Sequence, residues 1–132
     1  MDFSIVTQHG YLEVTLSGLP TPDAFNKYLD ALLAYEDWGL GIPLLSDETN
    51  LDASKITVQE VRDIAEICAQ RKSELGSIRT AILVAGELEY GMNSMWAVFV
   101  EDKWDVEAAI FRSREEALAW LSVPSIKFKV RQ

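Results

Sequence analysis

The order of apolar and polar residues predicts a β-hairpin at the beginning of the chain. Residues 11–17 alternate between apolar and polar side chains, which is the two-residue period of a strand with one buried face. Residues 3–7 form another short segment of strand-favouring residues, and His9 and Gly10 lie between the two segments as a predicted turn. The two segments therefore read as neighbouring antiparallel strands.

Four later segments carry apolar residues at the 3.6-residue spacing of amphipathic helices. They run over residues 22–38, 57–72, 88–100 and 114–121. Helix-start signals precede three of them: Thr21 before Pro22, Thr57 three residues before Glu60, and Ser113 three residues before Glu116. We therefore expect about four helices.

Short apolar runs lie between these helices and are typical of buried strands. They cover residues 43–47, 79–85 and 107–111, and residues 48–56 are predicted to be a polar loop. The tail over residues 124–132 alternates apolar and basic residues, which predicts an extra edge strand. The resulting order of elements predicts an α/β fold for residues 1–132, a single domain whose mixed β-sheet has about four helices packed on it.

The charge balance excludes several classes of partner. The chain has 21 acidic and 12 basic residues, a net charge of −9, and so repels nucleic-acid phosphates and anionic lipid headgroups. Its apolar runs are far shorter than the roughly 20 residues of a membrane-spanning helix, and Asp2 stands where a signal peptide carries positive charge. The one cysteine, Cys68, cannot form an internal disulfide bond and fits a reducing cytoplasm, the location we expect.

Candidate catalytic groups are few. His9 lies in a predicted turn, where a general base would lack an orienting acid and a pocket. No zinc-ligand cluster and no glycine-rich nucleotide motif is present in the sequence. Asp47, Glu48 and Asp52 are hard oxygen ligands for a divalent cation, but their spacing differs from that of a calcium loop, and a solvated loop is the preferred interpretation. The sequence therefore predicts no enzyme, no metal site and no cofactor.

Two segments resemble a known bacterial family. Ile110-Phe-Arg-Ser113 followed by Glu116-Ala-Leu-Ala-Trp-Leu121 is similar to the C-terminal end of the SpoIIAA-like proteins, small relatives of the STAS domain of anti-sigma-factor antagonists. The run Ala81-Ile-Leu-Val-Ala85 followed by Tyr90-Gly-Met92 is similar to another strand and helix start of that family. The resemblance covers roughly residues 10–122 and implies a SpoIIAA-like, STAS-related fold.

The resemblance also implies a candidate modification site. The antagonists carry an Asp-Ser-Ser-Gly motif whose second serine is phosphorylated, and the corresponding stretch is Asp52-Ala-Ser-Lys55. Ser54 is thus the candidate phospho-site. A phosphate there would lie near the helix that begins at Thr57, where free N–H groups and the helix dipole favour negative charge. Lys55 replaces the glycine of the motif, and the predicted cap at Thr57 leaves Ser54 in the preceding loop.

The resemblance favours a non-catalytic regulatory or protein-interaction module. STAS relatives present one helix and its adjoining loop to a partner, which is another protein or a second copy of the chain. The matching candidate surface here comprises five residues: Asp47, Asp52, Gln59, Arg62 and Glu66.

An alternative function is the carriage of a small apolar, lipid-like ligand. The fold group includes lipid-binding relatives, and methionine and aromatic side chains suit adaptable apolar cavities as well as ordinary cores. Simple core packing is the default interpretation of these residues. The candidate lining comprises Phe25, Leu29, Met92, Met95, Trp96 and Phe99.

Overall fold

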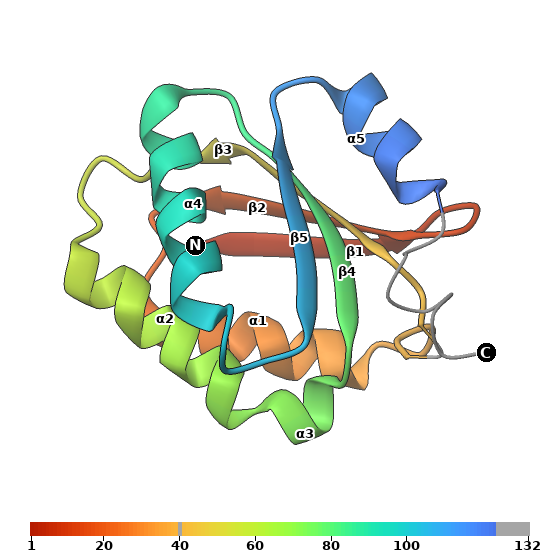
Figure 1. The fold of residues 1–132 in the computed structure, drawn as a ribbon, viewed down its shortest axis with the longest axis horizontal. Helices are drawn as coiled ribbons and strands as arrows, with labels where there is room; N and C mark the ends of the chain where they lie inside the picture. The colour runs from red at the N-terminus through yellow and green to blue at the C-terminus, as the bar shows by residue number, and fades with distance from the viewer. Residues whose placement is uncertain (40, 124–132) are drawn as a thin grey trace.

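The computed structural model describes residues 1–39 and 41–123, so the predicted edge strand over residues 124–132 lies outside the described part. Figure 1 shows a sheet with helices on both faces. The strands are β1 (Asp2–Thr7), β2 (Leu12–Gly18), β3 (Leu44–Leu51), β4 (Ile78–Leu83) and β5 (Val106–Phe111). The helices are α1 (Pro22–Ala34), α2 (Val58–Gln70), α3 (Lys72–Leu75), α4 (Glu87–Val100) and α5 (Arg114–Leu121).

The sheet is mixed, as the pattern of elements predicted. Its strand order is β1-β2-β3-β4-β5, with β1 antiparallel to β2 and the other neighbours parallel. Each parallel pair needs a crossover connection, and α1, α2 with α3, and α4 supply the three crossovers. The α/β prediction is confirmed, with four substantial helices and the short α3.

The two faces of the sheet pack against different helices because side chains alternate along each strand. Leu44 of β3 belongs to the large core that the sheet forms with α1, α2 and α4. Its neighbour Leu45 points to the other face, where it packs with Ala117 and Leu121 of α5. The larger core is therefore shared by α1, α2 and α4 together with Leu75 of α3, and in the described part of the chain α5 is the helix that closes the smaller one.

Several predicted boundaries were wrong. The first helix ends at Ala34 rather than at Trp38, and β4 ends at Leu83 rather than at residue 85. The structure extends β3 to Leu51, so the first half of the predicted loop over residues 48–56 is strand. Asn50 and Leu51 pair with the end of β2, and strand pairing has overridden the polar composition of this stretch. The second helix ends at Gln70 rather than at Lys72, and α3 follows it. Within the described residues, no helix has the length and apolar character needed to cross a membrane.

Candidate functional site

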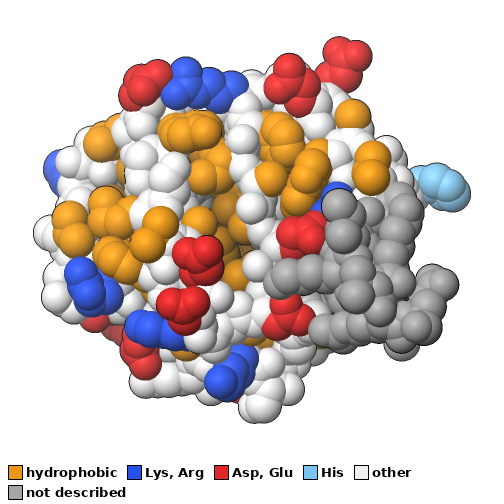
Figure 2. All heavy atoms as spheres, in the orientation of Figure 1, with side chains coloured by type: hydrophobic (Ala, Val, Ile, Leu, Met, Phe, Trp, Pro, Cys, Tyr) orange, Lys and Arg blue, Asp and Glu red, His pale blue; other side chains and the backbone are white. Residues whose placement is uncertain are grey.

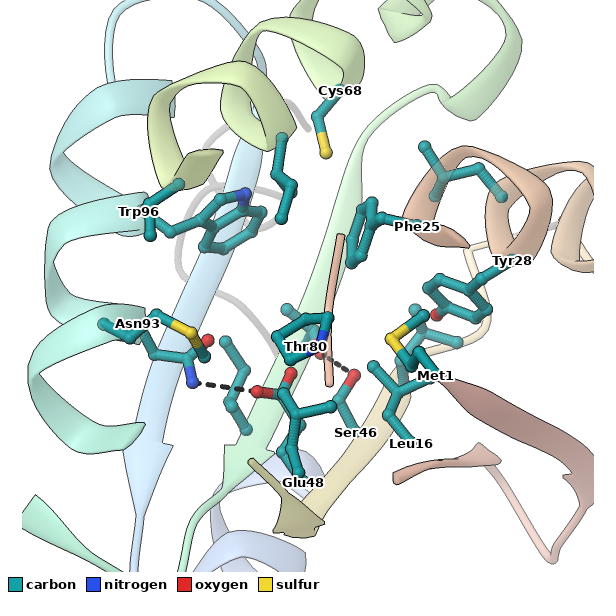
Figure 3. Close-up of a pocket in the computed structure, with 18 of the residues that line it drawn as sticks. Met1, Leu16, Phe25, Tyr28, Ser46, Glu48, Cys68, Thr80, Asn93 and Trp96 are labelled. Carbon is teal, nitrogen blue, oxygen red and sulfur yellow. Dashed lines mark hydrogen bonds between the residues drawn. The ribbon is translucent and has the colours of Figure 1, made fainter. Parts of the chain in front are cut away.

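A cavity of about 80 Å³ lies between helices α1, α2 and α4 and the face of the sheet that packs against them. Figure 3 shows that its walls come from both layers. Most of the lining is apolar: Met1, Leu16, Pro20, Phe25, Tyr28, Leu29, Leu32, Leu44, Leu51, Ile56, Val61, Ile64, Cys68, Ile78, Ile82, Met92, Trp96 and Trp104. Four polar residues complete it: Ser46, Glu48, Thr80 and Asn93. In the described part of the chain, these are also the four buried polar or charged residues.

Strand β3 carries two of these polar residues into the interior. Leu44, Ser46 and Glu48 alternate along the strand and so share the face that looks toward the helices. The hydroxyl of Ser46 lies 3.1 Å from that of Thr80 on the neighbouring strand β4, close enough for a hydrogen bond. The two hydroxyls therefore satisfy each other and add a small polar patch to the cavity floor.

Glu48 is a carboxyl group in a mainly apolar enclosure. Its residue is 7% exposed, and the side-chain N–H of Asn93 donates a 2.8 Å hydrogen bond to Oε1 (Figure 3). Burial raises the pKa of Glu48 to about 7, while the Asn93 hydrogen bond opposes that rise and the charge of Asp47 adds to it. The group therefore changes charge near neutral pH. Burial likewise raises the pKa of the Tyr28 phenol.

Two tryptophans of the lining differ in how their N–H groups are satisfied. Trp96 and Trp104 pack edge to face with ring centroids 6.3 Å apart. The indole N–H of Trp104 donates to the carbonyl of Gly76 at 2.8 Å. The indole nitrogen of Trp96 is buried and has no nitrogen or oxygen partner among the described residues; its N–H meets only the thiol of Cys68, a weak acceptor. Trp96 thus brings a poorly satisfied donor to the cavity wall.

The solvent-facing side of the cavity is formed by a few half-buried side chains. Met1, Phe25, Ile56, Met92 and Trp96 keep partial exposure, whereas the other lining residues are buried. Solvent therefore reaches the cavity past these five side chains. Met1 precedes β1, Phe25 belongs to α1, Ile56 lies in the loop before α2, and Met92 and Trp96 belong to α4.

The predicted apolar lining is placed unevenly. Phe25, Leu29, Met92 and Trp96 line the cavity, whereas Met95 and Phe99 are not among the lining residues. The Phe99 ring instead lies beneath the guanidinium group of Arg62 on α2, 4.5 Å from the ring centroid. The helical stripe on α4 therefore divides between the cavity and the contact with α2.

The predicted partner surface does not form one patch. Gln59, Arg62 and Glu66 are exposed on α2, but Asp47 points to the α5 face of the sheet and lies 3.9 Å from Arg114. Asp52 is exposed in the loop before α2, and hydrogen bonds from Ser54 lower its pKa. Strand alternation places Asp47 on the same face as Leu45, and this separates it from the α2 residues.

Comparisons with known proteins bear on the fold. The sequence matches no protein-family model, and a comparison with curated proteins also gave no match. A solved structure does match: an uncharacterised protein of the DUF3478 family with a SpoIIAA-like fold from Shewanella loihica. The TM-score is 0.57 at 23% sequence identity, and the match covers 91% of this chain and 92% of the other. This chain has a SpoIIAA-like fold.

In this SpoIIAA-like fold, the candidate phospho-site lies apart from the cavity. Ser54 is exposed in the loop between β3 and α2, where its backbone N–H donates to Asp52 at 2.9 Å. Thr57 caps α2 with the reciprocal hydrogen bonds to Glu60 that the sequence predicted. Ser54 therefore precedes the cap by three residues. No group of three or more potential metal ligands occurs among the described residues.

The sequence interpretation missed Glu48 and Asn93 as parts of one site. Glu48 was considered only as a cation ligand in a loop, and Asn93 was not considered. The two residues are 45 positions apart in the chain, so their proximity could not be inferred from local sequence. The sequence also carries no local signal that Glu48 belongs to a strand, since residues 46–50 are all polar and show no alternation of apolar and polar side chains. The partner of Glu48 on α4 could be identified only from the packed fold.

Proposed function

We propose that the protein binds a small, largely apolar molecule in the cavity between its sheet and helices α1, α2 and α4. The proposal rests on one observation: the four buried polar residues of the described chain all line this cavity. Buried polar groups are costly and are enriched where a ligand needs orientation. An apolar enclosure with a few convergent polar groups is the usual form of a small-molecule site.

The volume restricts the size of the ligand. Pockets for drug-sized molecules commonly have volumes of roughly 300–1,000 Å³, and an engineered cavity of about 150 Å³ accommodates benzene. A cavity of about 80 Å³ suits a compact molecule with only a few non-hydrogen atoms. The lipid-like ligand considered from the sequence is therefore replaced here by a much smaller one.

Core packing offers a simpler explanation of the same residues, and the cavity argues against it. Leaving a void costs about 24 cal/mol per Å³ in a protein core, or about 2 kcal/mol for an empty space of about 80 Å³. A wholly structural core would gain stability by filling that space with larger side chains. Retention of the space together with a titratable carboxyl group favours a binding role.

A blocking variant tests this function. Ile56→Trp places a large side chain at a half-buried position of the lining, whereas Val58→Trp enlarges a residue that is 55% exposed two positions further on. We expect 2-butanone, a probe with five non-hydrogen atoms, to give saturable shifts of amide NMR signals in the wild type and in Val58→Trp. Ile56→Trp should weaken this binding at least tenfold. Equal shifts in all three proteins, or none in the wild type, would contradict the proposal.

A second candidate function is self-association through the edge strand β5. In the described part of the chain β5 pairs only with β4, and all six of its residues are partly exposed. Five of the six are apolar, and Figure 2 shows hydrophobic side chains on the surface where Figure 1 places α4 and β5. An exposed apolar edge strand is a template for pairing with another strand. We propose a second copy of the chain as its partner.

The backbone of β5 supplies a matched test of this association. The carbonyls of Asp105 and Phe111 accept hydrogen bonds from β4, so by alternation Ala108 directs its N–H away from β4. Ala108→Pro removes that outward donor, whereas Ala108→Val retains it. We expect light scattering to give a dimer mass for the wild type and for Ala108→Val, and a monomer mass for Ala108→Pro. A monomeric wild type at millimolar concentration would exclude this association.

A further inference from the structure

The indole N–H of Trp96 is a hydrogen-bond donor for which the fold supplies only a weak acceptor, the thiol of Cys68. Only two buried side-chain nitrogen or oxygen atoms in the described residues have no nitrogen or oxygen partner: Trp96 Nε1 and Arg79 Nε. Arg79 is otherwise well satisfied, because its guanidinium group donates to the carbonyls of Trp120 and Val123 and pairs with Glu107. An indole has a single donor and no second group to compensate for it. Trp96 is therefore the buried side chain whose hydrogen-bonding capacity is least well met among the described residues.

The surroundings of Trp96 offer no good internal acceptor. Figure 3 shows the nitrogen-bearing edge of its ring turned toward the side of the cavity where Cys68 lies. Burial raises the pKa of the Cys68 thiol to about 12 and keeps it neutral, while the hydrogen bond of the Trp96 side chain opposes that rise. A neutral thiol sulfur is only a weak acceptor. Trp104, which packs against Trp96, has its own N–H satisfied by a carbonyl. An acceptor for Trp96 that is stronger than this thiol is thus best supplied from the cavity itself.

The charges around the cavity decide which acceptor fits. No lysine, arginine or histidine occurs among the described residues that line it, so an anionic ligand would lose its hydration without gaining a counter-charge. The Glu48 carboxyl group adds repulsion toward an anion whenever it is ionised. A cationic ammonium group has donors only and cannot accept from an indole N–H. An uncharged oxygen acceptor remains.

We infer that the cavity recognises a small uncharged molecule with a carbonyl or hydroxyl oxygen, and that this oxygen accepts the hydrogen bond of the Trp96 indole N–H. The inference rests on the proposed binding function and adds the chemical class of the ligand. The apolar walls enclose the hydrocarbon part of the molecule. Glu48 and Asn93 form a separate polar patch that also disfavours anions.

A pair of near-isosteric probes isolates this hydrogen bond. 2-Butanone and 2-methyl-1-butene have nearly the same shape, but the ketone has a carbonyl oxygen where the alkene has a methylene group. Their Kd values are measured by NMR titration in the wild type, in Trp96→Phe and in Trp120→Phe, whose tryptophan is outside the cavity lining. Taking the ratio of the two Kd values within each protein removes effects of packing that both probes share.

The expected result is a selective loss of affinity for the ketone. Trp96→Phe should lower the preference for 2-butanone over the alkene about fivefold, the equivalent of one ordinary hydrogen bond, and Trp120→Phe should leave it unchanged. In the wild type, 2-butanone should move the Trp96 indole N–H proton signal downfield, a readout that survives if Trp96→Phe does not fold. Butanoate at pH 8 should not bind measurably.

Each contrary result has its own meaning. If both probes bind but Trp96→Phe leaves their ratio unchanged and the indole signal stays in place, the assigned hydrogen bond is wrong while the binding function stands. Tight binding of butanoate would overturn the uncharged class. If neither probe binds the wild type, the proposed function fails and this inference fails with it.

Discussion

At the scale of single residues, Glu48 has the most consequential environment. Its pKa rises from 4.5 to about 7 because burial disfavours the charged form. Between these values the folded protein keeps a proton that the unfolded chain has lost. The contribution of Glu48 to stability is therefore most favourable below about pH 4.5, decreases as the pH rises, and levels off above about pH 7.

Glu48→Gln should remove this dependence, because glutamine keeps a carbonyl acceptor for Asn93 and has no charge to bury. We expect the variant to exceed the wild type in free energy of unfolding by up to about 3 kcal/mol at pH 8, since one pKa unit corresponds to about 1.4 kcal/mol. At pH 4 the two should agree closely. Urea denaturation at both pH values, with the exposed Glu115→Gln as control, measures the difference. A pH-independent difference would show that Glu48 is not buried as described.

At the scale of elements, helix α5 depends on a contact that the sequence suggested only in part. The apolar residues of α5 include Ala117, Leu118, Trp120 and Leu121, and of these Ala117 and Leu121 are buried. Trp120 is only half-buried: its ring packs at 5.8 Å from that of Phe111 and beneath the guanidinium group of Arg79 at 3.7 Å. Trp120 therefore joins α5 to β4 and β5 at the margin of the smaller core.

Trp120→Ala should cost about 2 kcal/mol of stability, below the roughly 3–5 kcal/mol typical of a fully buried aromatic residue. The aromatic contact and the cation–π contact each contribute on the order of 1 kcal/mol. Trp120→Phe, which keeps a ring over Arg79, should recover much of the loss. Chemical denaturation of the three proteins checks the series. A loss above about 4 kcal/mol would mean that Trp120 belongs to the closed core.

At the scale of the whole molecule, the sequence predicted the order of elements and failed at the site. Helix caps such as Thr57 with Glu60 are local, and strand alternation in residues 11–17 is local too, so both could be read directly. The cavity is lined by residues of three strands, β2, β3 and β4, and of three long helices, α1, α2 and α4. These elements are brought together by tertiary packing, which no single segment of the sequence encodes. The 45-residue separation of Glu48 and Asn93 is a direct example.

The most direct test of the binding site is a crystal structure of the protein soaked with 2-butanone. The account predicts density for the ketone between β3, β4, α2 and α4, with its oxygen at roughly 2.7–3.2 Å from Trp96 Nε1. The same crystals of Ile56→Trp should show the indole in that space and no ketone. An unoccupied wild-type cavity at saturating ketone, or a ketone bound only elsewhere, would contradict the proposal that this cavity is a ligand site.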